Sequence, residues 1–228
     1  MKTFPIISPS RSGHNWIMAM VQSWVWPNVV ERYENVYPER FTYHFGQRDH
    51  VIGSMMPPVL VVRDYLNWCA SYLKYRCNVP AGGPNRFKSI NGATLFWLAI
   101  TREALRHTCH IDPVVVVYYD EFVLNETYRR DICGQLGGSY DESMIDRVPC
   151  AGGYSSFDGR KHERSGSEMD VTNRFKWFFT AEGNYYMKFV RDNMEALEFY
   201  AANFMLDDQR RELVEIVREH KYIKKRIA

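Results

Sequence analysis

The chain carries little net charge and contains no hydrophobic run long enough to cross a membrane. Its 29 lysines and arginines nearly balance 27 aspartates and glutamates, and the net charge of +2 gives no reason to expect nucleic-acid binding. No apolar stretch approaches the roughly 20 residues of a membrane-spanning helix. The first residues lack the basic and apolar segments of a signal peptide. We therefore expect neither nucleic acid nor membrane among its partners.

Cysteines are few, and none of them forms a C-x-x-C pair. The five are Cys69, Cys77, Cys109, Cys133 and Cys150. An odd and dispersed set is typical of reduced thiols rather than of a disulfide framework, so we expect a cytoplasmic protein. His107 and His110 lie three residues apart, but their surroundings match no zinc-binding spacing, and no metal site is expected.

Short apolar runs alternate with helical periodicity along much of the chain. The expected strands cover residues 3–8, 41–45, 59–62 and 114–118. The expected helices cover residues 16–24, 65–75, 93–108, 125–136, 183–204 and 207–220. Asn125 is the expected N-cap of its helix. The alternation predicts an α/β fold in which helices flank a central parallel sheet. A chain of 228 residues suits one domain, so residues 1–228 are expected to fold as a single unit.

A polar loop follows the first expected strand. It carries Arg11, Ser12, Gly13, His14 and Asn15 before Trp16 begins the helical pattern. Unpaired N–H groups at the start of a helix attract anions, and an arginine and a glycine beside them favour a phosphate-binding loop. A turn with an exposed arginine explains the same residues. The sequence G-x-x-x-x-G-K-[ST] is absent, which excludes a standard nucleoside-triphosphate P-loop.

Residues 8–16 (S-P-S-R-S-G-H-N-W) resemble the 5′-phosphosulfate-binding loop of PAPS-dependent sulfotransferases, where PAPS is 3′-phosphoadenosine 5′-phosphosulfate. Cytosolic members have P-K-S-G-T-T-W in this loop, and carbohydrate sulfotransferases often have R-S-G. Arg11 replaces the cytosolic lysine, while His14 and Asn15 replace the two threonines. The resemblance implies a P-loop-like nucleotide site that uses PAPS as donor, releases 3′-phosphoadenosine 5′-phosphate (PAP) and needs no metal.

A second similarity lies at the third expected strand. In the family this strand ends in an arginine, a serine follows eight residues later, and the two bind the 3′-phosphate. Arg63 and Ser71 have this spacing. The placement agrees with ligand binding at the carboxyl ends of strands in α/β proteins. The alternative is an arginine paired with Asp64 or another acid, together with an ordinary helix serine.

Two later segments are also similar to the family. Residues 117–122 (V-Y-Y-D-E-F) resemble its Y-E-D-L segment, which implies that Tyr119 contacts the adenosine end of the nucleotide. A tyrosine packed at the sheet edge is the alternative. Arg160, Lys161 and Arg164 resemble a late R-K-G-x-x-G loop that closes over the 3′-phosphate, although His162 replaces the first glycine. A solvated basic loop explains them equally well.

The resemblance also implies the catalytic groups. Residues 42–45 (T-Y-H-F) are similar to the family's T-H-L-P segment, so His44 is the expected base. Its rivals are His14, His50, Glu31, Glu34 and Glu39. Arg11 is expected to stabilise the charge of the leaving nucleotide, since a guanidinium does not release its proton.

The resemblance extends over residues 3–166, and the helices expected in 173–220 add no signature. Two other functions remain open, a P-loop-like small-molecule kinase and a non-catalytic nucleotide-binding protein of the same fold. The expected acceptor is a small molecule or a carbohydrate bearing a hydroxyl or amine. Aromatic residues that could stack on it, but are more often buried in a core, are Trp24, Trp26, Tyr33, Tyr37, Trp177, Phe178 and Phe179.

Overall fold

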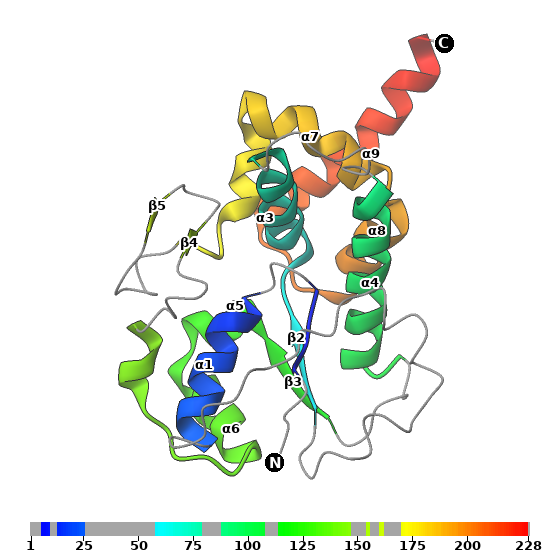
Figure 1. Cartoon of the computed structure of the whole chain (residues 1–228). Helices are drawn as coiled ribbons and strands as arrows, with labels where there is room; N and C mark the ends of the chain where they lie inside the picture. Colours follow the sequence, from blue (N-terminus) through cyan, green and yellow to red (C-terminus); the bar gives the residue numbers. More distant parts are fainter. Residues whose placement is uncertain are drawn as a thin grey trace.

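The computed structural model describes residues 6–9, 13–25, 58–78, 88–107, 114–146, 154–155, 160–161 and 170–227 (Figure 1). Within these ranges a small parallel sheet is combined with a larger set of helices, which is an α/β fold. The parallel sheet has three strands there, in the spatial order β1 (Ile6–Ile7), β2 (Val59–Val62) and β3 (Val115–Tyr118). The strand expected at 41–45 lies outside the described residues.

One group of helices covers the two faces of the sheet. It consists of α1 (His14–Val25), α4 (Lys88–Ala104), α5 (Tyr119–Leu124) and α6 (Glu126–Gln135). Another group extends beyond the end of β2 (Figure 1). It consists of α3 (Tyr65–Asn78), the 3-10 helix η3 (Arg174–Phe179), α7 (Ala181–Arg191), α8 (Met194–Asn203) and α9 (Asp208–Ile227). A further 3-10 turn, η2 (Glu142–Asp146), follows α6.

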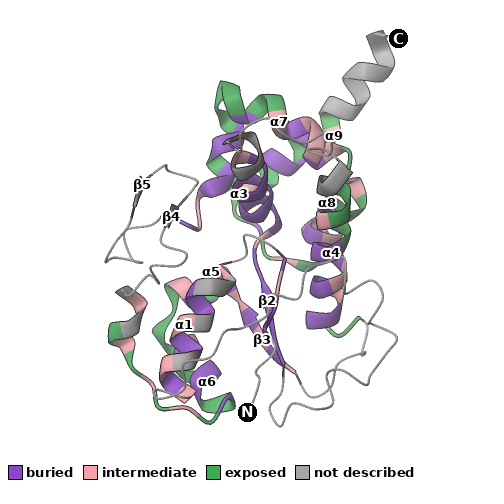
Figure 2. Cartoon of the chain, viewed as in Figure 1, coloured by how far each residue is buried: buried purple, intermediate pink, exposed green. Residues whose placement is uncertain are grey.

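Strand β2 is buried on both sides, and its side chains alternate between two cores. Val59 and Val61 pack in a cluster with residues of α1, α5 and α6. Leu60 and Val62 pack in another cluster with residues of α4. Successive side chains of a strand point to opposite faces, so a strand of four apolar residues needs cover on both. Figure 2 shows buried residues along the strands and on the helices around them, and further buried residues in the helices beyond the end of β2.

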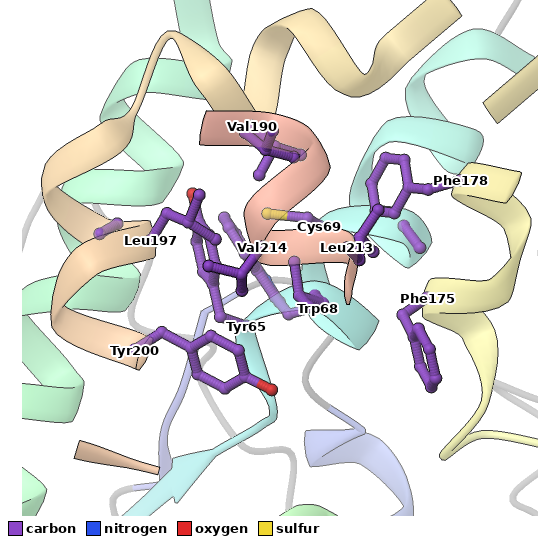
Figure 3. Packing of buried hydrophobic residues seen from close by; sticks show 14 of the residues in the cluster. Tyr65, Trp68, Cys69, Phe175, Phe178, Val190, Leu197, Tyr200, Leu213 and Val214 are labelled. Carbon is purple, nitrogen blue, oxygen red and sulfur yellow. The ribbon is translucent and has the colours of Figure 1, made fainter. Parts of the chain in front are cut away.

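The largest core lies among the helices beyond the sheet. Aromatic residues of α3, α4 and α8 form its centre, with the Tyr65 ring 4.7 Å from that of Trp97 and 5.9 Å from that of Tyr200. Leu213 of α9 is buried beside them (Figure 3). Because α3 begins directly after β2, this helical core continues from the carboxyl end of the central strand.

Sequence signals in the middle of the chain correctly predict the start of α6 and the presence of α4. The Asn125 side chain accepts a hydrogen bond from the Tyr128 N–H at 3.1 Å, which confirms the predicted N-cap of α6. The helix expected at 93–108 begins earlier, at Lys88, and ends at Ala104. Arg106 has a φ of +60°, a left-handed conformation that commonly follows the end of a helix.

The single helix expected at 183–204 is wrong, because the chain forms α7 and α8 there. Asp192 and Asn193 separate the two helices. Asn193 has non-helical φ and ψ angles of −119° and 49°, and its side chain donates to the Phe189 carbonyl at 2.8 Å. An asparagine amide that competes for a backbone carbonyl favours a turn over a continuing helix.

Within the described ranges, most of the aromatic residues considered for acceptor stacking are core residues, which is the role that the sequence favours for them. Trp24, Trp177 and Phe178 are buried, while Phe179 is 44% exposed. Cys69 and Cys133 are buried free thiols. Among the described helices, none is both long enough and apolar enough to span a membrane.

The packing on α5 leads to a first prediction. Phe122 is fully buried against the sheet, whereas Leu124 of the same helix is 73% exposed. Replacing Phe122 with alanine should lower the free energy of unfolding by about 3–5 kcal/mol, because it leaves a cavity. Leu124→Ala is the matched control and should change it by less than about 0.5 kcal/mol. Urea denaturation measures both, and equal effects would contradict this packing.

Candidate functional site

The loop between β1 and α1 ends in a glycine whose conformation is demanding. Gly13 has a φ of +79°, and its carbonyl accepts hydrogen bonds from the Trp16 and Ile17 N–H groups at 3.0 and 3.2 Å. A Cβ at this position would collide with the ring of Tyr119. Gly13 is therefore required both for the left-handed turn and for the close approach of the tyrosine.

Tyr119 lies where the three strands end. It follows β3 directly, is buried, and packs edge-to-face against Trp16 with the ring centroids 6.1 Å apart. The Arg63 guanidinium carbon lies 4.9 Å from the centroid of the same ring. This is within the range of a cation–π contact. Tyr119 thus joins the loop after β1 to the residue after β2.

Arg63 is buried at this edge, with only 1% of its surface exposed. Its Nη2 donates a hydrogen bond to the carbonyl of Val171 at 2.5 Å. Its own carbonyl accepts a hydrogen bond from the Trp97 indole at 2.9 Å. The guanidinium therefore lies between the Tyr119 ring and the chain segment that precedes η3.

Ser71 contacts the first residue of η3, a few residues after Val171. The Nη1 of Arg174, the first residue of η3, donates to the Ser71 hydroxyl oxygen at 3.0 Å. Both side chains are buried. The predicted pair of Arg63 and Ser71 is thus linked through residues 171–174, and a second arginine accompanies it. Sequence reasoning missed Arg174, and the available signal was an arginine within an aromatic run (N-R-F-K-W-F-F).

The indole N–H of Trp16 is a further hydrogen-bond donor near the carboxyl edge of the sheet. Its Nε1 is buried, and it has no hydrogen-bond partner among the described residues. Buried indole N–H groups usually find a partner. An acceptor from a ligand bound at the start of α1 would satisfy it.

Two carboxylates, those of Asp64 and Asp120, lie near Arg63. The Asp120 Oδ2 accepts a hydrogen bond from the Asp64 N–H at 2.9 Å, and its Oδ1 accepts one from the Asn67 amide at 3.1 Å. Burial, together with the negative charge of Asp64, raises the pKa of Asp120 from 3.8 to about 6, while Arg63 opposes the rise. Asp64 forms an ion pair with Arg210 at 3.1 Å. Asp64 also caps α3, since its Oδ1 accepts from the Asn67 N–H at 2.8 Å.

The structure describes the other predicted site residues only in part. Arg11, Ser12, His44 and Arg164 lie outside the described residues, as do the rival bases His50, Glu31, Glu34 and Glu39. His14 and Asn15 begin α1. Arg160 and Lys161, expected on a loop, instead form β5, which pairs antiparallel with β4 (Tyr154–Ser155). Residues 160–161 therefore belong to a two-stranded antiparallel sheet rather than to a loop.

Within the described ranges, no cluster of three histidine, cysteine, aspartate or glutamate side chains is placed to bind a metal ion. Comparison of the chain with protein-family models, with curated proteins and with solved structures finds no match.

The contact of Gly13 with Tyr119 leads to a second prediction. Gly13→Ala should destabilise the fold by at least about 2 kcal/mol, because the methyl group strains the left-handed backbone and displaces the ring. In a Tyr119→Ala background the ring is gone, and the same substitution should cost only about 1 kcal/mol. A double-mutant cycle measured by urea denaturation tests this. Equal costs in both backgrounds would show that the ring does not lie on Gly13.

The buried Asp120 leads to a third prediction. Its folded-state pKa lies above its ordinary value of 3.8, so the protonated form stabilises the fold. This stabilisation is complete below the unfolded pKa and is lost as the pH rises through about 6. The stability of Asp120→Asn relative to the wild type should therefore rise by up to about 3 kcal/mol between about pH 4 and about pH 7. Denaturant unfolding of both proteins across this range measures the difference. A constant or falling difference would contradict the raised pKa.

Proposed function

We propose that this protein is a PAPS-dependent sulfotransferase, which transfers a sulfuryl group to a hydroxyl or amine of a small-molecule or carbohydrate acceptor. One observation carries the proposal. Gly13, Arg63 and Tyr119 come from three separate motifs of the resemblance, and they meet at the carboxyl edge of the parallel sheet. Ligands of open α/β sheets bind at this edge.

The N-terminus of α1 supports a phosphosulfate site there. Gly13 places the first N–H groups of a 12-residue helix at the end of β1, and such groups attract anions. The buried Trp16 N–H, which has no partner among the described residues, is an additional donor next to them. Arg11 and Ser12 directly precede this turn in the sequence. These four residues would hold the 5′-phosphosulfate.

Arg63, Ser71 and Arg174 support a site for the 3′-phosphate. Arg174 already donates to the Ser71 hydroxyl, and Arg63 donates to the neighbouring Val171 carbonyl. Binding would exchange the Arg63–Val171 hydrogen bond for bonds to phosphate oxygens. Those bonds are charge-assisted on both sides and therefore stronger than a bond to a neutral carbonyl. The ring of Tyr119 would then border the adenosine.

The chemistry requires an in-line displacement at sulfur. The acceptor oxygen or nitrogen forms a bond to sulfur while the bond between sulfur and the bridging phosphate oxygen breaks, and PAP leaves with that electron pair. His44 is the proposed base that takes the acceptor's proton. Arg11 is the proposed group that stabilises the negative charge on the departing phosphate. The reaction needs no metal in this scheme.

Calorimetric titration with PAP tests the nucleotide site. The wild type should bind PAP, and Arg63→Ala should weaken binding roughly 10- to 150-fold, because it removes a charge-assisted hydrogen bond. Arg130→Ala is the matched control, since Arg130 lies exposed on α6 and pairs with Glu126. Its affinity should equal that of the wild type.

Two further measurements distinguish a sulfotransferase from a nucleotide-binding protein without activity and from a kinase. Sulfuryl transfer from PAPS to a panel of phenols, sugars and amines would distinguish an enzyme from a protein that only binds the nucleotide. Binding of ATP in preference to PAP would favour a small-molecule kinase. Absence of PAP binding by the folded wild type would contradict the proposal.

A further inference from the structure

One arginine of α9 contacts both chain segments that adjoin Arg63. The Nε of Arg210 donates to Asp64 Oδ2 at 3.1 Å, and its Nη2 donates to the Thr172 carbonyl at 2.8 Å. Asp64 is the residue after Arg63, and Thr172 is the residue after Val171, whose carbonyl accepts from Arg63. Arg210 therefore bridges the two segments between which the Arg63 side chain lies.

The remaining contacts hold the Arg210 guanidinium in one orientation. Its Nη1 donates to Asp207 Oδ2, and its carbon lies 4.3 Å from the centroid of the Phe175 ring. All three nitrogens and one face of the group are thus engaged, and the side chain is only 15% exposed. A planar fork with several donors can make these contacts together, whereas the compact ammonium of a lysine cannot.

Asn67 of α3 also hydrogen-bonds to the chain segment that contains Thr172. Its amide donates to the Thr172 carbonyl at 2.8 Å, and its oxygen accepts from the Phe175 N–H at 3.0 Å. It is fully buried and lies on the same helix as Ser71. The segment 171–175 is therefore fastened to α3 by Asn67 and to α9 by Arg210. Arg174, which contacts Ser71, lies within this fastened segment.

We propose that Arg210 is a positioning residue for recognition of the 3′-phosphate. The inference rests on the proposed function and goes beyond it, because Arg210 has no assigned role in binding. Arg63 and Arg174 come from distant parts of the chain, and a phosphate is recognised strongly only where their donors converge with the correct geometry. Arg210 and Asp64 set that geometry, since they fix the segment 171–174 relative to the end of β2. The specificity for a 3′-phosphorylated nucleotide thus depends on a residue of α9.

The test compares two nucleotides that differ only in the 3′-phosphate. PAP and adenosine 5′-monophosphate (AMP) are titrated into the wild type, Arg210→Lys and Arg211→Lys, with competition calorimetry for the weaker ligand. Arg210→Lys should reduce the ratio of PAP affinity to AMP affinity about tenfold or more, while AMP affinity stays within about twofold. Arg211→Lys is the control, because Arg211 is 64% exposed and pairs only with Asp208 among the described acidic residues. Its ratio should equal that of the wild type.

A second, more conservative variant keeps the inference testable if Arg210→Lys does not fold. Asp207→Asn removes the partner of the Arg210 Nη1 at a site that is 52% exposed. It should lower the ratio in the same direction by a smaller factor, and thermal melting checks that each variant is folded. An unchanged ratio in folded Arg210→Lys, or an equal loss of PAP and AMP affinity, would overturn the positioning role while leaving the proposed function intact. A wild type that binds neither nucleotide, or does not prefer PAP, would overturn the proposed function and this inference together.

Discussion

The burial of the Arg63 guanidinium at the carboxyl edge of the sheet constrains much of the structure around it. A buried cation is costly unless its surroundings replace the water that it loses. The Tyr119 ring and the Val171 carbonyl do so here, and Asp120 lies close enough for its pKa to respond to the charge. These groups come from two separate parts of the chain, residues 119–120 and residue 171. The end of β2 can be buried in this way only when all three are in place.

The same residues connect the two halves of the molecule. Two apolar clusters cover the two faces of the sheet, and a third forms among α3, η3, α7, α8 and α9 together with Trp97 and Leu98 of α4. Between them lies a polar layer in which Asp64, Asn67, Asp120 and Arg210 hydrogen-bond to one another and to the segment before η3. Buried polar networks of this kind favour one relative arrangement of the cores, because each donor has few alternative partners. A ligand at this edge would therefore contact both halves.

Local patterns in the sequence predict the framework of this arrangement. Continuous apolar runs predict β2 and β3, and an asparagine before a helical pattern predicts the start of α6. The sequence also predicts Arg63 at a strand end and Gly13 in a turn before a helix, because these features depend on neighbouring residues. The sequence does not predict the break between α7 and α8, since an asparagine in an exposed helical pattern is a weak signal without its hydrogen bond to the Phe189 carbonyl. The two proposed catalytic groups, Arg11 and His44, lie outside the described residues, so their roles stay predictions.

An α/β framework, the positions of its strand ends and the residue types at those ends can all be predicted from the amino-acid sequence alone. Such features follow from periodicity and turn chemistry over a few neighbouring residues. The contacts of Arg174 with Ser71 and of Arg210 with Asp64 join residues 103 and 146 positions apart, and they become visible only in the folded chain. No local pattern encodes such pairs, because they arise when the helical core packs onto the end of the sheet and each buried polar group must find a partner there.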